Sequence, residues 1–404
     1  MNDLDILAVN CGSSSLKFEL VCATRDADPP KVRRLAEGIV DRIGKAGRLR
    51  FSIDDGSGLD EPATIADHGE GIERVLDWVP SPTGGGRAVH AVGHRVVHGG
   101  DRFSGPVLID DAVEAAIDEA SRLAPLHNPP ALAAIRAARR RLPGVPMSAS
   151  FDTAFHATLP EHAYRYALPP DLADPHRIRR YGFHGLAHRW MTERYAAIAG
   201  RPLETVRLIT LQLGNGSSAA AIAGGRSVDT SMGMTPLEGL VMGTRSGDLD
   251  PAIPGFLARE EQVGIREVER WLNHRSGLLG LSGRSNDVRE LLEAEAAGDE
   301  AAARALDVYC YRVRKYIGAY LAVVGGAEAV IFGGGIGENQ PAIRERICDG
   351  MEWCGLVLDR ARNREVHATE AKISAQEARL AAYVVPVDEM AVIAQDVLAC
   401  LPPA

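Results

Sequence analysis

The chain has 404 residues, which is long for a single hydrophobic core, so two domains are expected. Hydrophobic residues make up 46% of it and charged residues 25%, the proportions of an ordinary globular protein. Its formal net charge of −9 argues against nucleic acid and acidic membrane surfaces as partners, so any anionic substrate must be held by individual arginines.

The sequence indicates neither a targeting segment nor a metal cluster. The acidic start, residues 1–5, runs directly into an expected strand and does not resemble a signal peptide. No apolar run reaches the roughly 18–20 residues that a membrane helix needs. The six cysteines show no Cys-x-x-Cys spacing, so neither a zinc site nor a disulfide framework is indicated. We expect a cytoplasmic protein whose cysteines are small buried side chains.

The N-terminal region is expected to open with a β-hairpin. Strands at residues 6–9 and 16–21 flank an Asn/Gly/Ser corner that starts at Asn10. The long stretch that follows carries only two expected elements, a strand at 48–53 and a helix at 71–78, and its pattern points to no particular chemistry.

The next two strands each carry a charged residue of interest. The strand expected at 89–100 contains Arg95, and a charge inside an apolar strand needs a partner. Arg95 is therefore either half of a buried salt bridge or an anion clamp, and the residues alone leave both open. The strand expected at 145–151 ends in Asp152, where open α/β folds place functional carboxylates, although a helix cap is the alternative. The helices expected between these strands cover 110–123 and 130–142.

The segment 208–222 repeats the hairpin pattern around a corner at residues 214–218. Glycine lets the backbone approach a ligand closely, and the Asn215 side chain adds a donor, so the corner can cradle an anion such as phosphate. A second such hairpin indicates a duplicated domain with one anion loop in each copy. His184, between two glycines before a helix expected at 186–199, either faces a phosphate or is an ordinary surface histidine.

Residues 228–251 show little periodicity, and a loop of that length inside a compact domain is usually functional. Arg245 within it is a second candidate anion clamp. The strand at 329–332 leads into a glycine run at 333–339 and then a helix beginning at Pro341, which presents backbone N–H groups to a nucleotide. Its spacing fits neither the dinucleotide fingerprint nor a Walker A motif.

Helices are also expected throughout the C-terminal half, at 254–260, 264–273, 287–297, 300–324 and 390–401. The last of them directly follows Glu389. At that position a carboxylate either stabilises the helix dipole or binds a cation.

These motifs, in this order, resemble the acetate kinase family over almost the whole chain. The most specific is the run from Asp229 to Pro251, with Asp-Thr-Ser-Met-Gly, Thr-Pro-Leu-Glu-Gly-Leu and Met-Gly-Thr-Arg-Ser-Gly-Asp. The resemblance implies an α/β fold of two duplicated ribonuclease-H-like domains of the actin-like ATPase type, with a cleft between them. It implies a first domain of residues 1–152 with 388–404, and a second of 153–387 that carries nucleotide and dimer contacts. It further implies a homodimer that catalyses reversible in-line phosphoryl transfer between ATP and acetate. The implied cofactors are ATP or ADP and Mg²⁺, with Mn²⁺ as an alternative metal.

Carried over position by position, the resemblance implies a set of catalytic residues: Arg95, His127, Asp152, His184, Asn215 and Arg245. The two arginines hold the acetate carboxylate and the phosphoryl group, His184 and Asn215 donate to phosphoryl oxygens, Asp152 organises magnesium and phosphate, and His127 supports the site. The implied metal-site residues are Asn10 and Glu389. The implied pocket for the acetate methyl consists of Val97, Leu126, Phe183 and Pro236, beside Arg95. The implied nucleotide site consists of Ser15, Lys17, Gln212, Leu213, Gly214, Asn215, Gly216, Asp287, Val288, Arg289, Gly335, Ile336, Gly337, Glu338 and Asn339.

One position departs from the family pattern. The family usually has a histidine two residues before the Gly-Asn-Gly corner, where this chain has Gln212. A glutamine donates a neutral hydrogen bond but never becomes a cation. The substitution therefore affects how strongly this position stabilises negative charge in the transition state, and it does not change the type of reaction. Two other functions stay open: a kinase for propionate or another short-chain carboxylate, and a non-catalytic actin-like ATPase that binds ATP to change shape.

Overall fold

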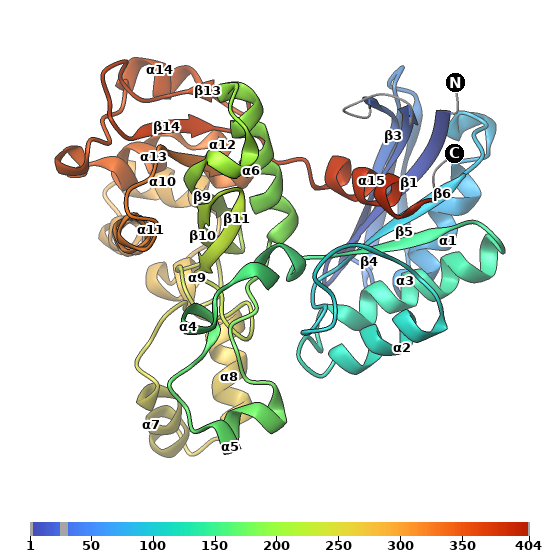
Figure 1. Cartoon of the computed structure of the whole chain (residues 1–404). Helices are drawn as coiled ribbons and strands as arrows, with labels where there is room; N and C mark the ends of the chain where they lie inside the picture. Colours follow the sequence, from blue (N-terminus) through green and yellow to red (C-terminus); the bar gives the residue numbers. More distant parts are fainter. Residues whose placement is uncertain (1–2, 25–30, 403–404) are drawn as a thin grey trace. The chain divides into compact units, whose positions relative to one another are not determined.

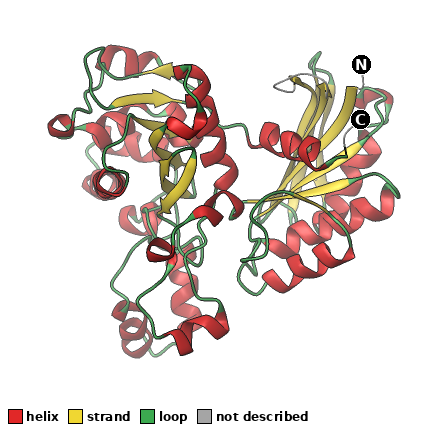
Figure 2. Ribbon diagram, viewed as in Figure 1, coloured by secondary structure: helices red, strands yellow, loops and turns green. Residues whose placement is uncertain are grey.

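The computed structural model describes residues 3–24 and 31–402 and divides the chain into two compact units. Unit 1 comprises Met1–Ala157 and Asp388–Ala404, and unit 2 comprises Thr158–Val387. Each unit has its own β-sheet flanked by helices, so the expected α/β class is confirmed (Figure 2). Residues 1–2 of the expected acidic start lie outside the described residues.

The sheet of unit 1 has the strand order β5-β4-β3-β2-β1-β6-β8-β7. Figure 1 labels β1, β3, β4, β5 and β6 of this sheet. The strands are β1 (Asp3–Cys11), β2 (Ser15–Thr24), β3 (Lys31–Asp41), β4 (Ala46–Ile53), β5 (Gly58–Thr64), β6 (Ala91–Val96), β7 (Val107–Leu108) and β8 (Met147–Phe151). β1 and β2 form the antiparallel hairpin that the sequence predicts. β6 pairs in parallel with both β1 and β8. The carboxyl ends of these three strands therefore lie at one edge of the sheet.

Helices cover both faces of this sheet. They are α1 (His68–Trp78), α2 (Asp111–Ala120), α3 (Asn128–Arg141) and α15 (Glu389–Cys400). Successive residues of β1 point to opposite faces. Leu7 belongs to the core that includes Ile135 of α3, whereas Ile6 packs in a smaller cluster with Val397 of α15. The last helix of the chain thus completes the core of unit 1.

The prediction is incomplete in the first half of unit 1, because it contains neither β3 nor β5. Charged residues such as Arg33, Arg34 and Glu37 hide the strand pattern of β3. β5 is an edge strand with mostly exposed residues, so no buried face marks it in the sequence. The expected strand at 89–100 is also shorter than predicted and ends at Val96.

The sheet of unit 2 has the order β11-β10-β9-β12-β14-β13. The strands are β9 (Arg207–Leu213), β10 (Ser217–Ala223), β11 (Arg226–Thr230), β12 (Ala329–Gly333), β13 (Ala371–Lys372) and β14 (Ala381–Val384). β9, β10 and β11 are antiparallel neighbours, and β12 is parallel to both β9 and β14. In unit 1 the strands β3, β2, β1, β6 and β8 have the same order and directions. The predicted duplication is therefore confirmed.

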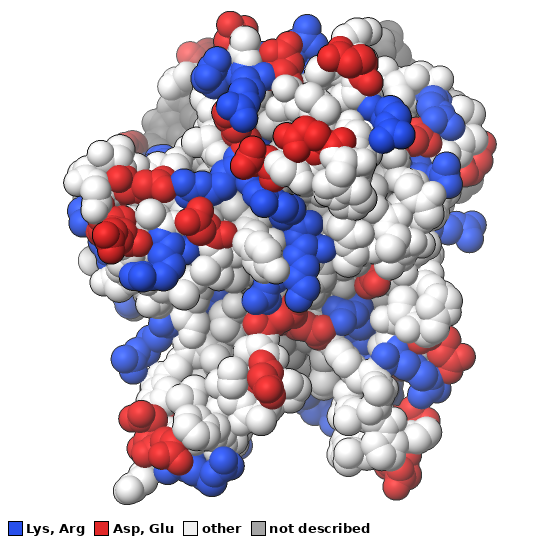
Figure 3. Space-filling view, turned by 90° about the vertical axis from the view of Figure 1, so that its left-hand side faces the viewer, with Lys and Arg blue, Asp and Glu red and all other residues white. Residues whose placement is uncertain are grey.

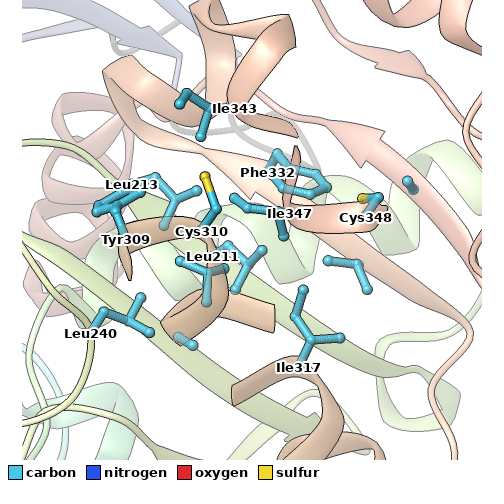
Figure 4. Packing of buried hydrophobic residues seen from close by; sticks show 14 of the residues in the cluster. Leu211, Leu213, Leu240, Tyr309, Cys310, Ile317, Phe332, Ile343, Ile347 and Cys348 are labelled. Carbon is cyan, nitrogen blue, oxygen red and sulfur yellow. The ribbon is translucent and has the colours of Figure 1, made fainter. Parts of the chain in front are cut away.

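The helices of unit 2 are α4 (Glu161–Tyr164), α5 (Pro170–Ala173), α6 (Gly185–Ala199), α7 (Ala252–Glu260), α8 (Ile265–His274), α9 (Gly277–Ser282), α10 (Val288–Ala296), α11 (Glu300–Val323), α12 (Gly334–Asn339), α13 (Pro341–Cys348) and α14 (Arg360–Glu365). The main core lies where α11 and α13 pack on one face of the sheet. Figure 4 shows Leu211 of β9, Phe332 of β12, Cys310 of α11 and Ile347 of α13 in this cluster. Helix α6 contacts β9 and β12 as well.

One prediction in unit 2 needs correction, and one helix was not predicted. The expected loop at 228–251 starts inside a strand, because β11 continues to Thr230 and pairs with β10. The glycine run after β12 forms a short helix, α12, which the sequence pattern does not predict. The helix expected from Pro341 is confirmed as α13.

Acidic and basic side chains are interspersed over the face shown in Figure 3, and neither sign covers it. In the part of the chain that the structure describes, no helix combines the length and apolar character needed to cross a membrane. All six cysteines are free thiols; Cys11, Cys310 and Cys348 are buried, and the others are partly exposed. The expectation of buried cysteines is thus confirmed for three of them.

Candidate functional site

The residues that the sequence singles out fall into two groups, one in each unit. In unit 1, Asn10, Arg95 and Asp152 stand at the carboxyl ends of β1, β6 and β8, and Glu389 starts α15. The pairing of Asn10 with Arg95 in the β1–β6 register brings the first two together. Parallel strands collect their functional groups at this edge because their carboxyl ends coincide there.

Arg95 is the centre of the unit 1 group. Its Nε and Nη2 donate to the two carboxylate oxygens of Asp152 at 2.7 and 2.5 Å, and its Nη1 donates to Asn10 Oδ1 at 2.8 Å. The Arg95 side chain is 14% exposed and that of Asp152 is 1% exposed. The structure thus shows the buried salt bridge that was one of the two alternatives for Arg95. Asp152 is engaged by Arg95, and the helix-cap alternative for it is wrong.

Glu389 joins this group through Asn10, whose Nδ2 donates to Glu389 Oε2 at 2.8 Å. Burial raises the pKa of Glu389, and the Arg95 charge opposes that rise. Burial by itself lowers the pKa of Arg95, but the carboxylates of Asp152 and Glu389 outweigh it and raise that pKa above its ordinary value. Two carboxylates therefore surround one guanidinium in a largely buried centre, and its oxygen atoms are of the kind that hard cations bind.

The other unit 1 residues differ in environment. Val97 is buried, whereas the side chain of Leu126 is 55% exposed to solvent. His127 stands at the N-cap position of α3 and forms no capping bond there. Ser15 begins β2, and Lys17 pairs with Asn10 in the β1–β2 register. The positive charge of Lys17 reaches Glu389, since it acts to lower the pKa of that carboxyl.

The unit 2 group is built around the corner between β9 and β10. Gly214 N donates to Gly216 O at 3.1 Å and closes the turn. A Cβ atom on Gly216 would lie 3.3 Å from His184 Nε2 and 3.7 Å from Arg245 Nη1. The structure therefore brings His184 and Arg245 to the same corner, as the sequence predicts, and glycine leaves room between them.

Asn215 is tied to neighbouring segments. Its Oδ1 accepts from Asn286 Nδ2 at 2.8 Å, and its carbonyl accepts from Gly243 N at 2.9 Å. Asn286 precedes Asp287, the N-cap residue of α10, whose Oδ1 accepts from Arg289 N at 2.8 Å. The corner and the start of α10 are thus adjacent, although the sequence gives no sign of the Asn215–Asn286 bond.

Arg245 differs from Arg95 in its partners. Its Nη1 donates to Pro236 O at 3.1 Å and lies 3.7 Å from the sulfur of Met242. Within residues 3–24 and 31–402, no carboxylate forms an ion pair with it. Burial lowers the pKa of Arg245, and no carboxylate of the described residues offsets this effect. For Arg95 the neighbouring carboxylates do offset it, and its pKa is raised. A largely buried cation without a counter-ion is an anion site in chemical terms.

His184 has a backbone conformation that few residues adopt. It lies in the left-handed region at φ 57°, directly before α6. Strained backbone of this kind is found preferentially at functional sites. The adjacent Tyr181 and Gly182 N–H groups both donate to Gly233 O, at 3.1 and 3.2 Å, which fixes the segment that carries His184. The alternative of an ordinary surface histidine does not fit, because its ring is packed at the corner.

The loop after β11 is held by residues that the sequence analysis did not single out. Arg180 Nη1 donates to the carbonyls of Thr230, Ser231 and Met232 at 3.0, 3.2 and 3.1 Å, and its Nη2 pairs with Glu238. Asp248 accepts from Gly239 N and from Tyr316 Oη, both at 2.8 Å. In the sequence, the one sign that Arg180 belongs to the site is its position directly before the Tyr181–Gly182 motif.

The glycine helix α12 packs against the end of β9. Gly334 has φ +74°, and a Cβ there would lie 2.6 Å from Leu213 O and 3.0 Å from Gln212 Cδ. Glu338 Oε1 accepts from Gly334 N at 2.8 Å and from Val387 N at 3.0 Å. The expected nucleotide residues 212–213 and 335–339 are thus neighbours. Gln212 Oε1 is buried and has no hydrogen-bond partner among the described residues.

The comparisons with known proteins agree on one family. The model of the acetokinase family matches residues 5–395. The acetate kinase of Chloroherpeton thalassium is 47% identical over 413 residues, covering 98% of this chain and 99% of that protein. The acetate kinase of Clavibacter michiganensis subsp. michiganensis is 50% identical over 397 residues, covering 98% of each.

Solved structures give the same result at the level of the fold. The crystal structure of Porphyromonas gingivalis acetate kinase is 41% identical with a TM-score of 0.91, covering 99% of this chain and all 100% of that one. That of a propionate kinase from Francisella tularensis subsp. tularensis is 35% identical with a TM-score of 0.90, covering 98% and 100%. The family match and these identities span nearly the whole chain. The chain therefore belongs to the acetokinase family.

Proposed function

We propose that this chain transfers the γ-phosphoryl group of ATP to acetate, giving acetyl phosphate and ADP, and that it also runs the reverse reaction. Its relatives named acetate kinase support the reaction class. The observation that carries the proposal is Arg245, a largely buried cation that faces the glycine corner beside His184 and has no carboxylate partner among the described residues. Such a cation is stabilised when an anion binds to it.

The chemistry needs positioning more than proton transfer. A carboxylate oxygen of acetate attacks the γ-phosphorus, an O–P bond forms, and the bond to the β,γ-bridging oxygen breaks with its electron pair on ADP. Acetate is already ionised at pH 7, so no general base is required. The obstacle is the approach of one anion to a polyanion, and fixed cations lower it by neutralising charge in the transition state.

The residues of the two units have different roles in this proposal. Arg245 binds the phosphoryl group, with His184 and Asn215 as hydrogen-bond donors to its oxygens. Arg95 binds the acetate carboxylate through the N–H groups of its Nη1 and Nη2 atoms that do not donate to Asp152 or Asn10. Asp152 holds Arg95 in place and does not act as a base, and His127 supports the site.

The unit 1 residues fit Mg²⁺, with Mn²⁺ as an alternative. Asp152, Glu389 and Asn10 offer carboxylate and amide oxygens, and burial raises the pKa of Glu389, which a bound cation would counteract. No cluster of three or more His, Cys, Asp and Glu side chains suited to a metal occurs in the described residues, so most ligands would be water and phosphate oxygens, as is usual for Mg²⁺. When bound, the ion neutralises charge on the phosphates.

The remaining residues are assigned to the substrates. The proposed nucleotide site consists of Ser15, Lys17, 212–216, 287–289 and 335–339. The proposed contacts to the acetate methyl group are Val97, Leu126, Phe183 and Pro236. We further propose a cytoplasmic homodimer; the exposed Ile253, Phe256 and Ile265 on α7 and α8 are suited to a subunit contact, and the free thiols fit a reducing compartment.

Propionate is the second candidate acceptor, because the propionate kinase from Francisella tularensis is close to this chain in structure. One additional methylene is discriminated by only about 1–3 kcal/mol. The test is a hydroxamate assay of acyl phosphate with acetate, propionate and butyrate, run with ATP and Mg²⁺. The proposal predicts the highest kcat/KM for acetate, with measurable turnover of propionate. A higher kcat/KM for propionate would reassign the substrate, and ATP hydrolysis without acyl phosphate would favour the actin-like ATPase.

A further inference from the structure

A chain of hydrogen bonds leads from His184 into the interior of unit 2. His184 Nδ1 lies 2.9 Å from Ser218 Oγ, and the same oxygen lies 2.8 Å from His188 Nε2. His188 Nδ1 lies 2.8 Å from Thr210 Oγ1. Ser218, His188 and Thr210 are fully buried. We call these four residues the His184 relay.

Regular secondary structure places the members of the relay. His184 is the N-cap residue of α6 and His188 lies in its first turn, and both rings reach the Ser218 hydroxyl. Ser218 of β10 is paired with Gln212 of β9, and Thr210 lies two residues before Gln212. Ser218 and Thr210 are therefore diagonal neighbours on one face of the sheet. The other face carries Ile209, Leu211 and Ala219, which belong to the apolar core, so the relay occupies the face toward α6.

The number of protons restricts the relay to two arrangements. Ser218 has a single hydroxyl hydrogen and contacts two imidazole nitrogens, so it can donate to only one ring. If it accepted from both rings, its own buried hydrogen would have no acceptor among the described residues, so it donates to one ring and accepts from the other. If Ser218 donates to His184 Nδ1, a neutral His184 carries its proton on Nε2. If Ser218 instead accepts from His184 Nδ1, a neutral His184 has a bare Nε2 and cannot donate at the corner.

Thr210 decides between the two arrangements. Within residues 3–24 and 31–402, the only hydrogen-bond partner of its hydroxyl is His188 Nδ1. In the first arrangement Thr210 donates to that nitrogen, His188 Nε2 donates to Ser218, and Ser218 donates to His184. In the second, Thr210 accepts and its buried hydroxyl hydrogen has no acceptor, which is unfavourable. In the first arrangement the hydroxyl hydrogens of Thr210 and Ser218 and the Nε2 hydrogen of His188 all have acceptors.

We propose that Thr210, His188 and Ser218 are positioning residues that fix His184 in the tautomer with a proton on Nε2, the nitrogen that faces Gly216. The inference rests on the proposed function, in which this N–H donates to the phosphoryl group. Three residues remote from the substrate thus set the polarity of a catalytic donor. A histidine whose second nitrogen is oriented in this way is a recurrent means of fixing the tautomer.

The direct test is the tautomer of His184, read from imidazole ¹⁵N chemical shifts of ¹⁵N-histidine-labelled protein, with His184→Asn to assign the signals. The wild type is expected to show the Nε2–H form. Thr210→Val, which keeps the shape and removes the hydroxyl, is expected to produce a mixture of tautomers. Thr192→Val is the matched control, because Thr192 is an equally buried threonine whose hydroxyl donates to the His188 carbonyl and not to its ring. It is expected to leave the tautomer unchanged.

Kinetics give a second readout. Loss of one transition-state donor typically costs about 10²–10³-fold in kcat. Ser218→Ala is expected to lower kcat about tenfold or more, with the KM for ATP within about twofold of wild type, because the donor acts in the transition state. His188→Gln retains an N–H for Ser218 and is expected to keep more activity than His188→Leu.

The two levels of the proposal fail separately. A wild-type Nδ1–H tautomer, or an Nε2–H tautomer that Thr210→Val leaves intact, would overturn the relay even if the protein phosphorylates acetate. The expected tautomers in a protein without phosphotransferase activity would uphold the relay and overturn the proposed function. Thr210→Val keeps the test decisive if Ser218→Ala does not fold.

Discussion

Asp152→Asn is the substitution that most sharply separates a structural role from a catalytic one in unit 1. It keeps the size of the side chain and removes the charge that faces Arg95. Asp152 accepts from Arg95 with both oxygens, at 2.7 and 2.5 Å, and the two side chains are almost entirely shielded from water. Asparagine has only one acceptor oxygen. In place of the second carboxylate oxygen it places an amide NH₂ group, itself a donor, against the guanidinium.

The expected magnitude follows from this geometry. Removing one partner of a buried ion pair typically costs about 3–5 kcal/mol. The Glu389 charge continues to act on Arg95, and one acceptor oxygen remains, so we expect the lower end, about 3 kcal/mol in the free energy of unfolding. A displaced Arg95 is expected to lower kcat about 100-fold, because misplacement of a catalytic group by 1 Å has an effect of that order.

The assay combines urea unfolding with the pH dependence of kcat. Asp111→Asn is the control, since Asp111 pairs with Arg139 at the surface, where loss of an ion pair costs about 0–1 kcal/mol. Asp152→Asn is expected to lower kcat at every pH without changing the shape of the profile, because Asp152 transfers no proton. A profile that loses its acidic limb in the variant would identify Asp152 as a base and refute the reasoning. Unchanged stability with full activity would refute it as well.

Two further predictions concern other parts of the molecule. Burial, with a smaller contribution from Asp388, raises the pKa of Glu19 from 4.5 to about 7. The folded state therefore holds this proton more tightly than the unfolded state does. As the pH rises from 4.5 to about 7, the folded state loses stability. Glu19→Gln is therefore expected to be more stable than wild type by about 1–2 kcal/mol at pH 8, since solvent screens a partly exposed carboxylate, and no more stable at pH 4. Urea unfolding at both pH values measures this, and a gain of the same size at pH 4 would contradict the assignment. Arg344 is fully buried, and its five donated hydrogen bonds go to oxygens of Gly337, Glu338, Asn363 and Val366. Arg344→Met is expected to cost about 3–5 kcal/mol and to raise the KM for ATP, whereas Arg360→Met at the surface is expected to change stability by less than about 0.5 kcal/mol; equal melting temperatures for the two variants would show that the buried bonds are dispensable.

Much of the fold could be predicted from local sequence patterns. The two hairpins were recognisable because apolar strands flank Asn/Gly corners, and their repetition indicated the duplication that the two sheets confirm. β3 and β5 could not be recognised, since their residues are charged or exposed and their strand structure depends on pairing with β2 and β4. Helix α12 was missed for a related reason: glycine is a poor helix former, and packing against the end of β9 overrides that preference.

The sequence nominates candidate site residues one by one, but it does not show the bonds between them. Arg95 and Asp152 were each recognised at the end of a strand, and only the parallel pairing of β6 with β8 joins them into an ion pair. His188 carried no clear signal, because His184 lies before α6 in a left-handed conformation and the spacing of four residues does not by itself bring the two rings together. Thr210 carried none, because its role depends on the contact between α6 and the sheet.

The central claim is that an anion at the glycine corner depends on Arg245, a cation that pairs with no carboxylate of the described residues. The most direct measurement is the kcat of Arg245→Ala for acetyl phosphate formation, with and without added guanidinium, beside Arg194→Ala, which removes a surface partner of Glu370. We predict a loss of about 10³-fold or more in Arg245→Ala, little change in the KM for ATP, partial recovery with guanidinium, and wild-type behaviour in Arg194→Ala. Turnover of Arg245→Ala within a few-fold of wild type would contradict the account.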